Sequence, residues 1–399
     1  MTELLAPVGN WIMLEAAIQA GADSVYLGIK GTNMRARAQN FELKDLEKIT
    51  QHAHKNKVKV YLTVNTIVYD NEIKKIKEIL KVAKKAKVDA VICWDLAVIQ
   101  EAKKLKLPIH ISTQASISNF EALKFYYKLG ARRFILAREL SLEQIKEIKK
   151  KIKQNKLKAE IEVFIHGAMC VSISGRCFMS QFSFNKSANR GECWQPCRRE
   201  YLIKDKENEI EFKLGHNYIL SPKDLCTIEF IDKLINAGID CFKIEGRNRS
   251  PEYVKTVVSA YRKVINSPKN KNLIKQQLEK LKTVYNKGFS TGFFLGKPIN
   301  QWSDQYGSKA TETKKYLGKV LNYYNKSQVA EILLEAGSLK IGDKIMIQGN
   351  KTGVIEQKIT SMEINKKKVK IASKGKRIGL KTKKARENDK VYKIVRKSS

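Results

Sequence analysis

Short apolar and β-branched runs alternate with amphipathic segments over the first 250 residues. The runs predict eight strands, which begin near Glu3, Ser24, Val58, Ala90, Pro108, Arg133, Ile161 and Cys241. The segments between them predict helices, and three of these open on the capping residues Asn10, Asn119 and Ser141. Strands and helices joined by short connections predict a parallel sheet in an α/β fold. Eight strands is the number of a closed (β/α)₈, TIM-like barrel. The alternative is an open doubly wound sheet, although the chain has no GxGxxG loop.

The pattern changes twice along the chain and divides it into two domains. A TIM-like catalytic barrel is predicted over residues 1–305, with a cysteine-rich insertion after strand 7 at about 167–220 and a helical extension at about 250–300. From residue 312 to 399, short alternating strands separated by Gly or Asn turns predict a small all-β barrel. This module is densely basic. We expect it to bind the substrate, while the plainer interpretation is a solvated charged face.

The charge of the chain favours an anionic partner. With 77 Lys and Arg against 40 Asp and Glu, the formal net charge is +37. Nucleic acid is the commonest polyanion that such a surface binds, although a codon bias toward Lys and Asn would also raise the Lys count. No apolar run approaches the roughly 18 residues of a membrane span, and no leader segment is evident. We therefore expect a cytoplasmic protein without a membrane partner.

Four of the seven cysteines lie close together, as Cys170, Cys177, Cys193 and Cys197. In a reducing compartment, clustered cysteines are more often metal ligands or catalytic groups than disulfides. Zinc sites usually present tight CxxC pairs, whereas the spacing here is C-x6-C-x15-C-x3-C. The pattern leaves open an iron–sulfur cluster, a zinc ion or a catalytic thiol. Because an insertion after a barrel strand lies on the C-terminal face, all four are expected over the barrel mouth.

Polar residues occupy the predicted C-terminal ends of several strands. Residues from several strand ends that point into one mouth are the usual make-up of a barrel active site. Charge-assisted contacts from Arg and Lys suit a small substrate with carboxylates. We predict substrate-binding roles for Arg138, Lys243, Arg247, Asn65 and Gln114, and catalytic roles for His166, Glu245 and Asp95. Taken singly, each residue could equally make a buried structural hydrogen bond.

Several blocks of the chain resemble a known family. The block EVFIHGAMCVSISGRCFMS, residues 162–180, is similar to the signature of the collagenase-like peptidase family U32. Further blocks that resemble the family extend over residues 1–265, among them NMRARAQNF, SANRGECWQPCR and KIEGRNRSPEYV, and the C-terminal module resembles the family's usual one. No hydrolytic triad or metalloprotease motif is evident in the sequence. The only support for a peptidase is therefore the name of the family.

The resemblance carries specific expectations. Better understood members are iron–sulfur proteins that hydroxylate without molecular oxygen, and their ligands fall on the four clustered cysteines, which implies a [4Fe–4S] cluster. One branch, the tRNA hydroxylation proteins, forms 5-hydroxyuridine at the wobble position, with prephenate implicated as the hydroxyl source. The length, the basic module and the intact CWQPCR block are most similar to this branch. We therefore expect tRNA as the partner and prephenate as the co-substrate.

Other interpretations stay open. A second branch of the family hydroxylates a cytidine of ribosomal RNA, and a third, which serves ubiquinone synthesis, usually lacks the C-terminal module. The resemblance also implies that a paralogous U32 partner subunit could be required. From other classes, a collagenase-like peptidase and a zinc-stabilised RNA-binding protein without chemistry are the alternatives.

Overall fold

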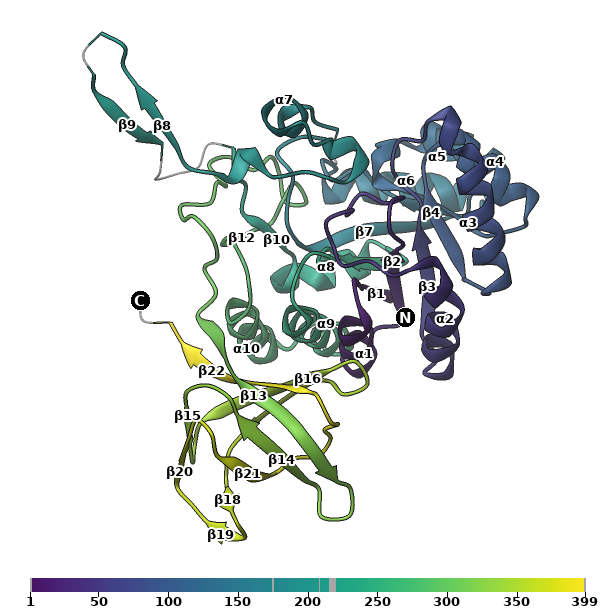
Figure 1. Cartoon of the computed structure of the whole chain (residues 1–399). Helices are drawn as coiled ribbons and strands as arrows, with labels where there is room; N and C mark the ends of the chain where they lie inside the picture. Colours follow the sequence, from purple (N-terminus) through teal and green to yellow (C-terminus); the bar gives the residue numbers. More distant parts are fainter. Residues whose placement is uncertain (1, 174–175, 208, 215–219, 398–399) are drawn as a thin grey trace.

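The structure, a computed structural model, describes residues 2–173, 176–207, 209–214 and 220–397. Eight parallel strands form its centre (Figure 1). They are β1 (Glu3–Pro7), β2 (Ser24–Gly28), β3 (Lys59–Thr63), β4 (Ala90–Cys93), β5 (Ile109–Ile111), β6 (Arg133–Ile135), β7 (Glu160–Gly167) and β11 (Cys241–Ile244). Strand β11 pairs with both β1 and β7, which closes the barrel. The predicted TIM-like barrel and its eight strands are confirmed, and the open sheet is ruled out.

Helices connect the strands and cover the outside of the barrel. They are α1 (Trp11–Gln19), α2 (Leu46–Lys55), α3 (Ile73–Lys85), α4 (Leu96–Lys104), α5 (Phe120–Lys128), α6 (Leu142–Gln154), α8 (Ile231–Asn236) and α9 (Pro251–Asn266), with α10 (Lys271–Lys282) following. The predicted caps are confirmed. The side chains of Asn10, Asn119 and Ser141 each accept a hydrogen bond from a backbone N–H of the first turn of α1, α5 and α6.

In the described part of the insertion after β7 there are one short α-helix and one hairpin. These are α7 (Met179–Phe184) and the strands β8 (Tyr201–Lys204) and β9 (Glu211–Leu214), which project from the body of the molecule (Figure 1). The chain then returns to the barrel as β10 (Asp224–Cys226), antiparallel to β7, and β10 also pairs with β12 (Phe289–Ser290). The sequence pattern did not predict β10 and β12, because these strands depend on pairing with β7 and with each other.

The C-terminal module is an antiparallel structure with its own core. Its main sheet has the order β17-β16-β22-β13-β14-β21-β18-β19, and β15 pairs separately with β20. The strands are β13 (Glu312–Tyr324), β14 (Val329–Leu334), β15 (Ser338–Lys340), β16 (Lys344–Gly349), β17 (Gly353–Lys358), β18 (Glu363–Ile364), β19 (Lys367–Lys368), β20 (Ile371–Ser373), β21 (Arg377–Lys381) and β22 (Lys390–Arg396). Met346 and Val354 of the module pack against Ala16 of α1. The all-β character of this part is therefore confirmed.

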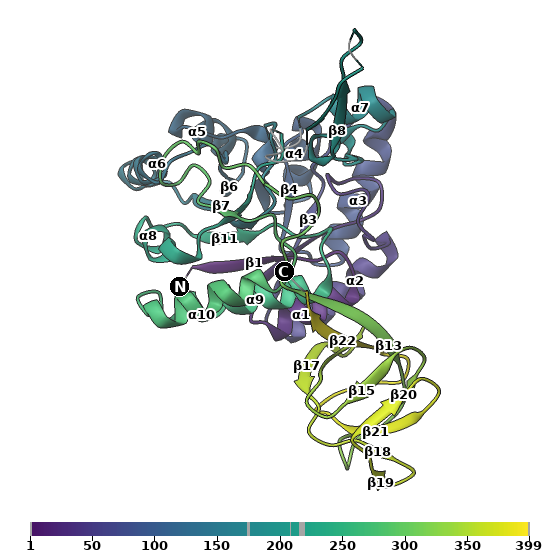
Figure 2. The same ribbon diagram turned by 90° about the vertical axis from the view of Figure 1, so that its left-hand side faces the viewer.

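Figure 2 shows β8 of the insertion at the top of the molecule and the C-terminal module at the bottom, so the two appended structures lie at opposite ends. The module lies against α1 on the outside of the barrel. Within the described residues, no helix is long and apolar enough to cross a membrane.

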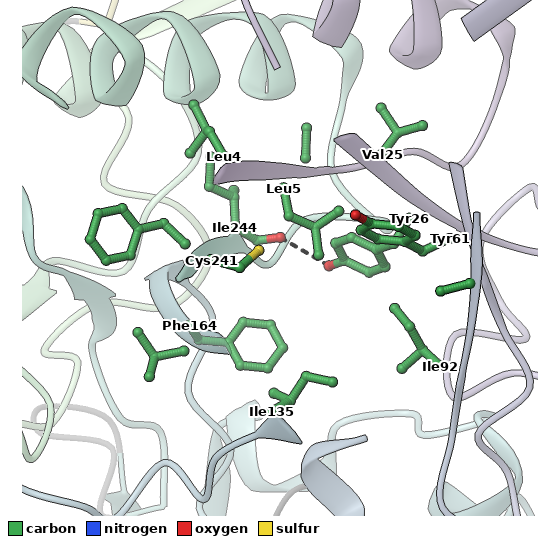
Figure 3. Packing of buried hydrophobic residues seen from close by; sticks show 14 of the residues in the cluster. Leu4, Leu5, Val25, Tyr26, Tyr61, Ile92, Ile135, Phe164, Cys241 and Ile244 are labelled. Carbon is green, nitrogen blue, oxygen red and sulfur yellow. Dashed lines mark hydrogen bonds between the residues drawn. The ribbon is translucent and has the colours of Figure 1, made fainter. Parts of the chain in front are cut away.

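Buried aromatic and aliphatic side chains fill the barrel. Figure 3 shows Tyr26 and Tyr61 among them, with the Tyr26 hydroxyl donating a hydrogen bond to the carbonyl of Ile244 at 2.9 Å. This contact ties β2 to β11 across the interior. Both tyrosines are at most 3% exposed, and buried hydroxyls of this kind need a hydrogen-bond partner.

A network of charged residues lies in the same interior. The Arg133 guanidinium donates to both carboxylate oxygens of Glu3, at 2.8 and 2.9 Å, and lies 3.7 Å from the Glu162 carboxylate. Glu162, which is 0% exposed, accepts a hydrogen bond from Lys243 at 2.7 Å. Buried charges of this kind are tolerated only when they are paired. The network therefore couples β1, β6, β7 and β11.

We predict that Arg133→Ala lowers the free energy of unfolding by about 3–5 kcal/mol, because it leaves buried carboxylates without their partner. Chemical denaturation at neutral pH measures the change. The neighbouring and exposed Arg132 provides the control, and Arg132→Ala is expected to change the free energy by about 0.5 kcal/mol or less.

The pH dependence gives a second readout of the same network. Burial alone would raise the Glu3 pKa, but Arg133 outweighs it and the pKa falls from 4.5 to about 2. A lowered carboxyl pKa adds stability above 4.5 that is lost as the pH falls toward 2. The difference in the free energy of unfolding between wild type and Arg133→Ala should therefore shrink as the pH falls from 4.5 toward 2. A difference that is small at neutral pH would contradict the network.

Candidate active site

A cavity of about 190 Å³ lies at the barrel mouth, beneath the insertion. Its wall includes residues from strand ends and from the insertion. Among them are Cys170, Cys177, Cys193, Cys197, Arg138, Lys243, Glu245, Arg247, Asn65 and Gln114. The structure thus brings together ten of the twelve residues that the sequence singled out.

Close backbone contacts hold the insertion over the mouth. Gly191 lies against the loop after β2, and its carbonyl accepts a hydrogen bond from the Ala36 N–H at 3.1 Å. A Cβ at this glycine would lie 2.3 Å from the Asn33 carbonyl oxygen, and its φ of +84° also favours glycine. Arg190 adds an ion pair to Glu72 at the start of α3. These contacts fix the insertion relative to β2 and β3.

The four cysteines are free thiols around this cavity. Backbone N–H groups donate to two of the sulfurs, from Met179 to Cys177 at 3.4 Å and from Gln195 to Cys193 at 3.3 Å. Burial raises the pKa of Cys197 to about 11, and the neighbouring thiols add to this effect while Arg198 opposes it. Hydrogen bonds to sulfur stabilise thiolate ligands and tune a bound cluster.

The four thiols are neighbours, since Cys197 interacts electrostatically with the three other cysteines. Among the residues that the structure describes, no three His, Cys, Asp or Glu side chains are arranged to hold a metal ion. Four thiolates are the ligand set of a structural zinc ion as well as of a four-iron cluster, so the chemistry of the donors fits either group.

Two arginines bring unpaired nitrogen atoms to the cavity. Arg138 donates from Nη1 to the Ala168 carbonyl at 2.9 Å, but its buried Nε and Nη2 have no hydrogen-bond partner among the described residues. The buried Nε of Arg247 has none either, while its Nη1 donates to Thr63 at 3.0 Å. Buried donors without a partner are rare and call for an explanation. An anionic ligand with carboxylate oxygens would satisfy them.

Burial also acts on the ionisation of these arginines. It lowers the pKa of Arg247 to about 10 and lowers the pKa of Arg138. Burial therefore disfavours the charged form of each guanidinium relative to water. An anion beside the two arginines would offset this cost.

Glu245 offsets part of the positive charge. Its carboxylate accepts a hydrogen bond from the Arg35 Nε at 3.2 Å. Burial alone would raise its pKa, but Arg35, Arg247 and Arg138 outweigh burial and the pKa is lowered. Glu245 is thus held as a carboxylate. Arg35 was missed as a site residue, because it lies in the loop after β2 rather than at a strand end. The only signal was the resemblance of NMRARAQNF to the family.

Lys243, Asn65 and Gln114 line the cavity but already have partners. Lys243 is paired with Glu162 and lies 4.4 Å from the centre of the Tyr26 ring. The Asn65 amide donates to Ser112 at 3.2 Å and accepts a hydrogen bond from the Met34 N–H at 3.3 Å. The Gln114 side-chain oxygen accepts from Ser112. These residues shape the cavity, and their roles in substrate binding stay predictions.

His166 and Asp95 lie outside the set of residues that line the cavity. The His166 ring is buried against Tyr261, Tyr253 and Phe289, and burial lowers its pKa to about 3. The Asp95 carboxylate caps α4 by accepting the Ala97 N–H at 2.9 Å. These are structural contacts, and a catalytic role for either residue stays a prediction.

Comparison with known proteins adds to this picture. The model of peptidase family U32 matches residues 9–304. A protein named collagenase from Porphyromonas gingivalis is 45% identical over 98% of this chain and 97% of its own length. The tRNA hydroxylation protein P1 of Bacillus subtilis is 37% identical, over 87% of this chain and 83% of its own length. The 23S rRNA 5-hydroxycytidine C2501 synthase of Escherichia coli is 37% identical, over 66% and 39%.

We predict that a small dicarboxylate binds in the cavity through Arg138. Succinate should raise the melting temperature of the wild-type protein, and Arg138→Met should weaken succinate binding about tenfold or more, because it removes charge-assisted hydrogen bonds. Isothermal titration calorimetry measures the affinity. Arg132→Met removes an exposed arginine directly before β6 and should bind succinate like wild type. Equal affinities for the two variants would contradict the assignment.

Proposed function

This chain belongs to peptidase family U32, and we propose that it hydroxylates tRNA. In this proposal the product is 5-hydroxyuridine at the wobble position, the hydroxyl group comes from prephenate rather than from molecular oxygen, and the protein carries a [4Fe–4S] cluster. The observation that carries the proposal is one cavity whose wall combines four cysteines with buried, unpaired arginine nitrogens.

The cluster would be held by Cys170, Cys177, Cys193 and Cys197. Two observations support these ligands. All four line one cavity, and two accept backbone N–H hydrogen bonds. When bound through all four cysteines, such a cluster would supply a centre that carries electrons. The protein contributes the position of the loop, which Gly191 and Arg190 fix over the mouth.

The donor would lie beneath the cysteines, against the arginines. Prephenate carries two carboxylates, and Arg138 and Arg247 offer three buried nitrogen atoms without a partner in the described chain. Glu245 and Arg35 form an ion pair at the wall of the same cavity. This arrangement supports binding of one small dianion in a fixed orientation, as a group-transfer reaction requires.

A second, larger groove supports an RNA partner. A groove of about 1100 Å³ runs between the barrel and the C-terminal module. On the module side, its wall includes the exposed cations Lys351, Lys383, Arg386 and Lys390. On the barrel side it includes Gln39, from the loop that also carries Arg35. A groove lined by these cations fits a phosphate backbone, which supplies affinity without base specificity.

Two other functions have a specific observation in their favour. The similarity to the 23S rRNA 5-hydroxycytidine synthase supports a ribosomal RNA substrate, but this chain covers only 39% of that relative. The similarity to the protein named collagenase supports a peptidase. A peptidase needs an activated nucleophile or a metal-bound water, and the described cavity lining includes no histidine. Compared with these two functions, hydroxylation of tRNA accounts for more of the residues that line the cavity. A paralogous partner subunit stays a prediction.

We predict that Cys193→Ser loses both the cluster and the activity, because a hydroxyl is a poor replacement for a thiolate ligand. Anaerobically purified wild type should contain about four irons per chain and the variant far fewer. Nucleoside analysis of tRNA from a deletion strain should show loss of 5-hydroxyuridine derivatives. The wild-type gene should restore them and Cys193→Ser should not.

Cys93→Ala is the matched control, because Cys93 is buried in β4 away from the cavity. It should keep both iron and activity. A zinc-loaded wild-type protein, or full activity of Cys193→Ser, would contradict the proposed ligands. Unchanged tRNA with altered ribosomal RNA would shift the substrate to the second branch. Cleavage of gelatin by the purified protein, with unchanged RNA, would favour the peptidase.

We also predict that the groove binds RNA through its cations. The triple variant Lys351→Gln, Lys383→Gln, Lys390→Gln should bind tRNA more weakly whatever its sequence, and the slope of log affinity against log salt should fall by about 2–3. Fluorescence anisotropy over a salt series measures both. The control replaces Lys74, Lys77 and Lys81, which are exposed on α3, and removes the same charge. Equal slopes for the two triple variants would contradict a role for the groove.

A further inference from the structure

A third cavity adjoins the one that the cysteines line. It has a volume of about 230 Å³, and we call it the rim pocket. Its wall includes Met34, Trp94, Gln114, Arg176, Phe178 and Asn189. Met34 and Gln114 also line the cysteine cavity. The two cavities therefore share a wall.

The two aromatic rings of the rim pocket differ in their surroundings. Trp94, directly after β4, is fixed because its indole N–H donates to the Asn65 carbonyl at 3.0 Å. The Arg176 guanidinium lies 4.9 Å from the centre of its ring. Phe178, in contrast, is 63% exposed. A large aromatic side chain left in water beside a functional cavity commonly marks a binding surface.

The polar groups of the rim pocket suit a flat, hydrogen-bonding ligand. Arg176 is oriented by a hydrogen bond from Nη2 to the Gln114 carbonyl at 2.6 Å. Asn189 is a further polar residue of the wall, and side-chain amides pair with the donor and acceptor edges of bases. Aromatic faces and an arginine plane are the groups on which proteins stack unpaired bases.

We propose that the rim pocket binds an unpaired nucleobase of the RNA substrate, stacked on Phe178 and Trp94. This inference rests on the proposed function, since it assumes that RNA reaches the mouth. The shared wall of Met34 and Gln114 places the bound base beside the cysteine cavity. An enzyme that modifies a base has to take it out of its stack, and a pocket next to the chemistry holds the nucleotide after that step.

Phe178 allows a sharp test, because it is exposed and its replacement should leave the fold intact. The probe is a short RNA hairpin whose loop contains 2-aminopurine, a fluorescent base that is quenched by stacking. Phe178→Leu should weaken binding of the hairpin about tenfold and reduce the quenching, because stacking of one base is lost. Phe178→Tyr keeps an aromatic face and should restore both. Phe125→Leu, which replaces a phenylalanine that is 58% exposed on α5, is the control.

Iron content should be the same in all variants, which shows that Cys177 next to Phe178 is undisturbed. Wild-type affinity and quenching in Phe178→Leu, with wild-type protein still hydroxylating tRNA, would overturn the rim pocket and leave the proposed function standing. Loss of quenching in Phe178→Leu, with no hydroxylation of any RNA by the wild type, would support the pocket and overturn the proposed function. No binding of the hairpin by the wild type would overturn the pocket.

Discussion

One buried carboxylate, Glu162 on β7, joins the packed interior of the barrel to its mouth. It faces Arg133, which belongs to the network below, and it pairs with Lys243, which lines the cavity above. This carboxylate is 0% exposed, and it is tolerated because Lys243 hydrogen-bonds one oxygen while the charge of Arg133 lies 3.7 Å from the other. Without Glu162, Lys243 would carry an uncompensated charge beneath the cavity. The position of the cavity floor therefore depends on this contact.

The charged side chains at the mouth are paired differently from those in the interior below it. Below the mouth, each buried cation has a carboxylate partner, as Arg133 has Glu3. At the mouth, Arg138 and Arg247 keep buried nitrogen atoms without a partner in the described chain. A buried nitrogen without a hydrogen-bond partner destabilises a packed interior, whereas in a binding site it donates to a bound anion. The change from paired to unpaired cations along the barrel axis marks where packing ends and the site begins.

Much of this architecture follows from local sequence patterns. The apolar runs predicted all eight barrel strands, because a parallel sheet buried on both faces requires them. Arg138, Lys243, Glu245 and Arg247 were found because their strands end together at the mouth. Arg35 and Arg176 were not, since each reaches its cavity from a loop whose path depends on tertiary contacts. His166 lies at the end of β7, but its ring packs against Tyr261 of α9, which a strand count does not reveal. The short strands β10 and β12 depend on pairing with β7 and with each other.

The central claim is that the cavity at the mouth uses its cysteines and arginines to hydroxylate RNA. The most direct measurement incubates the anaerobically purified protein with an unmodified tRNA transcript and prephenate, without molecular oxygen, and follows the RNA by mass spectrometry. The account predicts that the anticodon fragment gains the mass of one oxygen atom, and that omitting prephenate abolishes the gain. An iron-loaded protein that leaves the transcript unchanged would contradict it.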